Sequence, residues 1–289
     1  MNEKVKKGCG IGCGVFTILI FIIIGSIAFF VRDMSADYKA VSKVEKELIA
    51  AYGGLDSYVP TAGGQPSPDR VQLFVEIRKD QAEWRHNVST AFEEFLVRKE
   101  TSSGGGFKHF LKLLRSTTEM APSLAGFWSS RNAALIDRGM GMGEYSYIYC
   151  LAYFSYLGYD PGDGAHDSNL DFGGSSGSGL EVSTSGAMTE EQRRDAAWSR
   201  VHDLMLPMLE SIDTEGMALS DDEARKWLAE VELEVGMMQE SLMRYPWRDG
   251  APRVLSDVFR PYRKDLEEQY DISVNPVELI FEKLDTDEE

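Results

Sequence analysis

Cysteine is scarce in this sequence. The chain has 289 residues and three cysteines, and only Cys150 follows residue 31. No disulfide can therefore form within residues 32–289, although disulfides stabilise many secreted domains. Because ten of the 14 Phe and all 12 Tyr and 5 Trp follow residue 31, we expect this part of the chain to be stabilised by a packed core.

Short catalytic motifs are also missing. No glycine–lysine dipeptide occurs, which excludes a P-loop lysine. The four histidines share no metal-ligand spacing; they are His86, His109, His166 and His202. The segment Gly173-Gly-Ser-Ser-Gly177 matches the nucleophile elbow of serine hydrolases, but low-complexity sequence replaces the strand and helix that an elbow requires. The sequence therefore assigns no enzyme class.

Charged residues are absent from Gly8 to Val31, a run of 24 residues. A helix of this length, rising about 1.5 Å per residue, crosses a hydrocarbon core of about 30 Å. A cleavable signal peptide is the alternative, because Ser26-Ile-Ala28 resembles a cleavage site, but the apolar part of a signal peptide usually spans about 7 to 15 residues. We expect a retained single-pass transmembrane helix at 8–31, with the lipid bilayer as its partner.

Cations flank both ends of this apolar run. A basic tail, residues 1–7, carries Lys4, Lys6 and Lys7, whereas the flank after Val31 mixes its cations with acidic residues. The positive-inside rule then favours a cytoplasmic N-terminus. We expect residues 32–289 to lie outside the cytoplasm, in the periplasm if the source is bacterial.

The chain after the apolar run is strongly acidic. Residues 1–31 carry three lysines and Glu3, a net charge of +2, so the whole-chain charge of −17 leaves −19 for residues 32–289. This charge repels phosphate backbones and anionic headgroups. We therefore expect no nucleic-acid partner and no peripheral lipid binding by this part of the chain, whereas basic proteins and divalent cations are suitable partners.

The apolar spacing predicts a mainly α fold. The transmembrane helix should continue into a helical stalk, 32–52, which Gly53-Gly54 ends. A linker, 53–67, should lead into a multi-helix globular domain, 68–284, followed by a disordered acidic tail, 285–289. Within the domain we predict helices from Ser67-Pro68 towards Glu100, over Phe107–Arg115 and Ser123–Arg138, from a capping box at Thr189, from a second box at Ser220 to about Arg244, over Arg253–Tyr270 and over Pro276–Leu284.

The segment Tyr145 to Tyr159 is rich in tyrosine. A helix would be apolar nearly all round and therefore buried. A strand would alternate its tyrosines and suits their β-propensity. Helical neighbours on both sides favour the helix, and the strand remains the alternative.

A long loop, residues 160–187, contains seven glycines, six serines and five acidic residues but no lysine or arginine. We expect it to be flexible. Its potential ligands for a hard cation are Asp160, Asp163, His166, Asp167 and Asp171. The spacing lacks the closing Glu of an EF-hand, so we expect no cofactor, with a Ca²⁺ site at these residues as the alternative.

Two sets of residues are candidate contacts with the membrane or a partner. Small residues at the start of the apolar run permit close helix approach; they are Gly8, Gly10, Gly12 and Gly14. The stalk presents an apolar face that includes Met34, Tyr38, Val41 and Leu48. This face can dock on its own domain or form a short dimeric coil, so a homo-oligomer stays open.

These features predict a non-enzymatic, membrane-anchored interaction module, or an accessory or structural subunit of a membrane protein complex, with a protein partner. One alternative is a membrane-tethered extracytoplasmic hydrolase or metal-dependent enzyme whose residues come from distant helices. A second is a sensor of divalent cations, which rests on the acidic segments 160–187 and 211–222.

Overall fold

The computed structural model describes residues 41–100, 107–163, 170–171, 181–182, 190–212 and 220–279, and this part of the chain is mainly helical. The predicted transmembrane helix 8–31, stalk residues 32–40 and tail 285–289 lie outside the described residues. Within the described ranges, no helix is both long and apolar enough to cross a membrane.

Helices make up nearly all of the described elements. The N-terminal half contains a helix over 41–52, the 3₁₀ turns η1 (Leu55–Ser57) and η2 (Ala62–Gly64), and α2 (Pro68–Asp80), α3 (Ala82–Glu100), α4 (Phe107–Arg138) and α5 (Met142–Tyr149). The remainder contains the π-helix η3 (Cys150–Tyr156), α6 (Glu190–Glu210), α7 (Asp221–Glu240), α8 (Arg253–Phe259), the 3₁₀ turn η4 (Arg260–Tyr262), α9 (Arg263–Gln269) and α10 (Asn275–Glu278).

Local chemistry explains where several helices begin and end. The Ser67 side chain accepts a hydrogen bond from the backbone N–H of Arg70, and Pro68 occupies the first position of α2. Ser220 and Glu223 form a reciprocal capping box at the start of α7. Gly53, with φ +81°, ends the helix over 41–52. These three predicted boundaries are confirmed.

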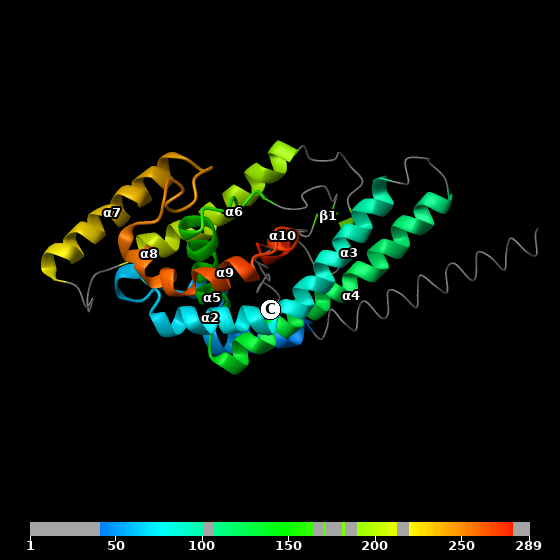
Figure 1. Ribbon diagram of the computed structural model, residues 1–289, viewed down its shortest axis with the longest axis horizontal. Helices are drawn as coiled ribbons and strands as arrows, with labels where there is room; N and C mark the ends of the chain where they lie inside the picture. Colours follow the sequence, from blue (N-terminus) through cyan, green and yellow to red (C-terminus); the bar gives the residue numbers. More distant parts are fainter. Residues whose placement is uncertain are drawn as a thin grey trace, which may run out of the picture.

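Two predicted helix boundaries are wrong. The helix expected from Ser67 towards Glu100 is divided into α2 and α3, because Gln81 has ψ near 1° and leaves the regular helical path. Conversely, the two helices expected within 107–138 form one helix of 32 residues that continues through Pro122. Proline removes one backbone hydrogen bond, but α4 runs alongside α3 (Figure 1), and this packing offsets the loss.

The tyrosine-rich segment is helical, as predicted. It forms α5 and then the π-helix η3, whose turns are wider than those of an α-helix. At the end of η3 the Leu157 N–H donates a hydrogen bond to the carbonyl of Ala152, five residues earlier, at 3.0 Å. Every residue from Tyr145 to Ser155 is buried. A helix that is apolar on all sides has to be surrounded by other elements, and this one forms the centre of the body.

The segment expected to be a long loop contains two short strands. β1 (Leu170–Asp171) pairs antiparallel with β2 (Glu181–Val182), with Leu170 opposite Val182. The C-terminal prediction is also modified. The helix expected over Arg253–Tyr270 is divided into α8, η4 and α9 around Pro261. The last predicted helix, Pro276–Leu284, is described only to residue 279, where α10 covers Asn275–Glu278; residues 280–284 lie outside the described residues.

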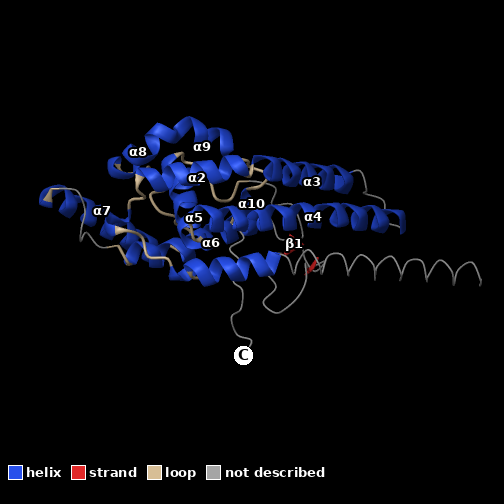
Figure 2. Cartoon of the chain, turned by 90° about the horizontal axis from the view of Figure 1, so that it is seen from below, coloured by secondary structure: helices blue, strands red, loops and turns tan. Residues whose placement is uncertain are grey.

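The core has two parts. The larger cluster surrounds α5 and η3 and receives side chains from α2, α6, α7, α8 and α9. The smaller cluster lies between α3 and α4 and is completed by two C-terminal residues; its members are Val88, Phe92, Leu124, Phe127, Val274 and Val277. The α3–α4 hairpin projects from one end of the body and α7 lies at the opposite end (Figures 1 and 2).

The end of the predicted stalk packs against this body. Leu48 is only 1% exposed and belongs to the larger core cluster. The Tyr52 hydroxyl donates a hydrogen bond to the Ile136 carbonyl at the C-terminal end of α4, 3.4 Å. Of the two arrangements considered for the stalk face, docking on its own domain therefore describes residues 41–52.

Candidate functional site

The most distinctive chemical group of the described residues is a buried arginine enclosed by aromatic rings. Arg78, on α2, is 1% exposed. Its guanidinium carbon lies 5.0 Å from the ring centroid of Tyr149 and 4.9 Å from that of Tyr153. An aromatic face attracts a cation, and the attraction strengthens when water is excluded. The tyrosine-rich segment therefore forms an internal site for a positive charge.

Glu278 supplies the opposite charge. One oxygen of its buried carboxylate lies 2.6 Å from Nη1 of Arg78, and the other accepts a hydrogen bond from the Tyr145 hydroxyl at 3.3 Å. Nη1 of Arg131 lies 3.8 Å from the same carboxylate. Glu278 is on α10, 200 positions after Arg78. The ion pair thus joins the beginning of the globular domain to its end.

A second arginine extends the network. Arg85, on α3, donates to the Arg78 carbonyl at 2.5 Å and also to the side-chain oxygen of Gln269. Counting Arg78, Arg85 and Arg131 against Glu278, the buried cluster has a formal charge of +2. Backbone carbonyls help to stabilise this positive charge by accepting hydrogen bonds, since Nη2 of Arg78 donates to the Gln269 carbonyl at 2.7 Å.

Asn275 attaches the C-terminal segment to two further parts of the chain. Its fully buried side chain accepts a hydrogen bond from the Tyr149 hydroxyl at 2.9 Å. The same side chain donates to the carbonyls of Pro161 and Asp163, at 3.1 and 2.9 Å. Buried amides are stable when all their hydrogen bonds are made. Residues 161–163, α10 and the end of α5 are therefore held together by one side chain.

Burial fixes the protonation of this cluster. Burial raises the pKa of Tyr145, Tyr149 and Tyr153, so these phenols stay neutral. Burial alone would lower the pKa of Arg78, but Tyr153, Tyr145 and Glu278 together raise it well above its ordinary value. Burial also raises the pKa of the Cys150 thiol. The guanidinium stays charged and the phenols stay protonated at neutral pH, so the cluster is suited to fastening elements together.

The predicted calcium ligands are only partly described. The Asp160 carboxylate accepts hydrogen bonds from Arg194 at 2.7 Å, Trp198 at 2.5 Å and the Gly162 N–H at 2.7 Å. Asp163 accepts a long hydrogen bond, 3.4 Å, from the Asp160 N–H. The oxygens of Asp160 are therefore occupied by protein donors.

The remaining predicted ligands do not complete a site. His166 and Asp167 lie outside the described residues, and Asp171 lies on β1. Across the ranges given above, no three His, Cys, Asp or Glu side chains are grouped to hold a metal ion. Calcium binding by this segment stays a prediction.

The predicted partner contacts either lie outside the described residues or are buried in the fold. Gly8, Gly10, Gly12, Gly14, Met34 and Tyr38 all lie outside the described residues. Val41 and Leu48 are described, and both are buried within the chain's own fold. We therefore do not include these two residues in the surface that we consider for a partner.

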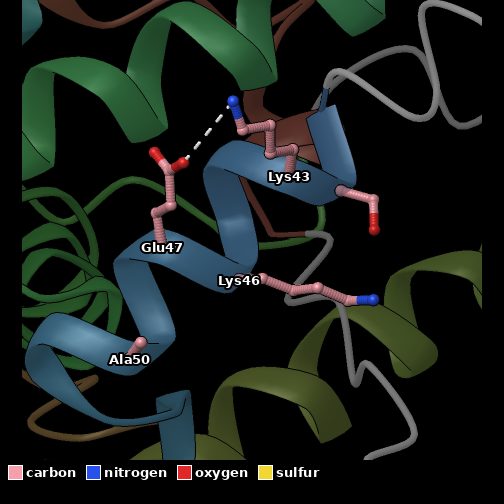
Figure 3. A pocket seen from close by; sticks show the side chains of 5 residues that line it. Lys43, Lys46, Glu47 and Ala50 are labelled. Atoms are coloured by element: carbon pink, nitrogen blue, oxygen red, sulfur yellow. Dashed lines mark ion pairs between the residues drawn. The ribbon is translucent and has the colours of Figure 1, made fainter.

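A depression on the helix over 41–52 is open to solvent. It is lined by Ser42, Lys43, Lys46, Glu47 and Ala50 (Figure 3). Lys43 and Glu47 form an i,i+4 ion pair of 3.9 Å, and their side chains are 78% and 58% exposed. An exposed pair of this kind is screened by water and salt, so the depression has no buried group that could orient a ligand.

Comparison with protein-family models, curated proteins and solved structures finds no match for this chain.

The Arg78 cluster was not among the predicted sites. One signal was present in the sequence, because Arg78 continues the helical spacing of Val71, Phe74 and Val75 on the buried face of α2. An arginine on an apolar face requires a buried partner. Nothing in the local sequence identifies Glu278 as that partner.

Proposed function

We propose that this chain is a single-pass, membrane-anchored helical interaction module that serves as a non-enzymatic accessory or structural subunit of a membrane protein complex. The main support for this function is that buried charged side chains connect separate elements of the fold. Arg78, Arg85 and Glu278 fasten α2, α3 and the C-terminal segment to one another, which suits a rigid scaffold. The uncharged run Gly8 to Val31 supplies the anchor.

The decisive experiment isolates the intact protein from its native membranes in a mild detergent, after cross-linking, and identifies its neighbours by mass spectrometry. We expect a protein neighbour at constant stoichiometry. A control variant replaces residues 8–31 with an unrelated membrane helix, and retention of the neighbour then assigns the contact to the domain. Migration as a free monomer with no cross-linked neighbour would refute the proposed function.

We further propose that the helical domain lies outside the cytoplasm, following the three lysines before Gly8. Because Cys150 is buried, a variant with Cys9→Ser, Cys13→Ser and the exposed Ser241→Cys has one reactive thiol. A membrane-impermeant maleimide should label this thiol while the membrane that holds the anchor is intact. Labelling only after this membrane is opened would reverse the orientation.

A further inference from the structure

α7 has a second apolar stripe on the side that faces solvent. Its buried side carries Trp227, Val231 and Met238. On the other side, Ala229, Leu233, Gly236 and Met237 follow the i, i+4, i+7, i+8 spacing of one helix face, and Leu233 is 64% exposed.

The turn directly after α7 carries two more exposed apolar side chains, Leu242, 63% exposed, and Met243, 39% exposed. We call the outward stripe and this turn the α7 outer face. Large apolar side chains gathered in this way often mark an interaction site.

Gly236 has no side chain to cover the α7 backbone on this face. A methyl group added at Gly236 would meet nothing within 4 Å, so this part of α7 is open. Glycine in the interior of a helix costs about 1 kcal/mol relative to alanine. Small residues on a helix surface allow another helix to approach closely. The geometry at Gly236 therefore fits a helical occupant.

Every charged residue between Lys226 and Arg244 is acidic, and Lys226 itself pairs with Asp222 at 2.6 Å. Glu230, Glu232 and Glu240 are exposed. Arg244 itself binds Glu234 at 2.8 Å and Asp249 at 3.0 Å. A binding segment that carries Lys or Arg beside its apolar residues would therefore be complementary in charge.

We propose that the α7 outer face binds an amphipathic helix whose apolar stripe is flanked by lysine or arginine, supplied by the protein partner. This inference rests on the proposed function and specifies the contact. The face from Ala229 to Glu240 is roughly 18 Å long, about three helical turns. An amphipathic helix of that length can place apolar residues against Leu233 and Gly236 and its cations near the glutamates.

Other occupants fit this face less well. A second copy of the chain, related by a two-fold axis, would place Glu230, Glu232 and Glu240 against the same acidic residues. Anionic lipid headgroups would be repelled by the same charges. The acidic neighbours of Leu233 therefore favour a basic partner over a self-contact or a membrane contact.

The test in native membranes places a photo-cross-linking amino acid at Leu233 of the full chain. A matched control places it at Ile272, another large apolar residue, 52% exposed. We expect an adduct from position 233 but not from 272, with the linked peptide carrying an apolar helical stripe and Lys or Arg. Adducts only with lipid or with a second copy, or equal adducts from both positions, would overturn the proposal.

A binding measurement with purified full chain in detergent uses a synthetic helical peptide of leucine and lysine, with a scrambled peptide of the same composition. We expect Leu233→Asp and the pair Glu230→Lys/Glu232→Lys each to weaken binding at least tenfold, and Ile272→Asp to leave it unchanged. Equal binding of both peptides, or no effect of Leu233→Asp, would contradict the proposal.

These results separate the two proposals. If a stoichiometric neighbour is isolated from native membranes but position 233 gives no specific adduct, the interaction module stands and its contact lies on another surface. If no neighbour is isolated at all, the proposed function fails together with this inference.

Discussion

Replacing Glu278 by glutamine tests the role of the buried arginine cluster. Glutamine keeps the shape of the side chain and an acceptor oxygen but removes the negative charge. Arg78 then stays buried without its counter-ion, and the formal charge of the cluster rises from +2 to +3. Removing one partner of a buried ion pair costs about 3–5 kcal/mol. We therefore expect Glu278→Gln to lower the free energy of unfolding by about 3 kcal/mol.

A double variant separates this charge effect from a general loss of packing. In Arg78→Met/Glu278→Leu, the remaining Arg85 and Arg131 give the cluster a formal charge of +2, the same as in the parent. Apolar residues of similar volume often replace a buried ion pair at little cost. The double variant should therefore be more stable than Glu278→Gln, by about 2 kcal/mol, although it carries one more substitution.

The assay is urea unfolding of the full chain in detergent, followed by tryptophan fluorescence, since Trp227 and Trp247 are buried and stacked at 5.7 Å. The control is Glu47→Gln, which breaks the exposed Lys43–Glu47 pair. We expect this control to change stability by less than about 0.5 kcal/mol.

Two results would refute this reasoning. A loss below about 1 kcal/mol in Glu278→Gln would mean that the carboxylate does not neutralise Arg78. A double variant less stable than Glu278→Gln would mean that hydrogen bonds of the Arg78 guanidinium outweigh the cost of burying its charge.

Three further predictions concern other positions. Gly64→Ala should lower the free energy of unfolding by about 2 kcal/mol or more, because φ is +68° and the added methyl group would lie 2.3 Å from Ile212. Gly54→Ala, where nothing lies within 4 Å, should be nearly neutral, and similar urea midpoints for the two variants would contradict this prediction. Trp247→Gly should be less destabilising than Trp247→Ala, because φ is +49° there, and the reverse order in urea unfolding would exclude backbone strain. Stability should fall above about pH 9, because burial raises the pKa of Cys150 and of buried tyrosines such as Tyr153 above their ordinary values of 9.0 and 10.0, so that the unfolded chain loses these protons first. Cys150→Ala should delay this fall, and a constant urea midpoint up to pH 10.5 would refute the prediction.

Features governed by neighbouring residues could be predicted from the sequence. The starts of α2 and α7 follow from Ser67, Pro68 and the box Ser220–Glu223, which act within one helical turn. The helical nature of the tyrosine-rich segment, which the structure shows as far as Tyr156, followed from the helices expected on both sides of it. The π-helical turns of η3 did not, because i→i+5 bonding depends on the elements that surround this segment.

Helix continuity was harder to predict because tertiary packing decides it. Pro122 favours a break, yet α4 continues through it alongside α3. At Gln81 the sequence contains neither proline nor glycine, yet the chain turns there between α2 and α3. In both places, contacts between helices outweigh the intrinsic preference of one residue.

The Arg78–Glu278 pair could not be predicted because its partners are 200 positions apart and the chain has 47 acidic residues. The position of Arg78 on an apolar helix face shows that a partner is needed. Only the fold selects one carboxylate among the many. Conversely, the dense acidic residues near Asp160 suggested a cation site, where the structure places the cationic side chain of Arg194 and the indole N–H of Trp198.

The same C-terminal segment reaches both core clusters. Val274 and Val277 pack between α3 and α4, while Asn275 and Glu278 bind the tyrosine-rich segment and Arg78. The position of the hairpin relative to the body therefore depends on a few residues at the end of the globular domain. If this is correct, Glu278→Gln should increase hydrogen exchange in α3 before it does so in α6, because α3 loses the segment that closes its core. Equal increases in both helices would show that the two clusters unfold together.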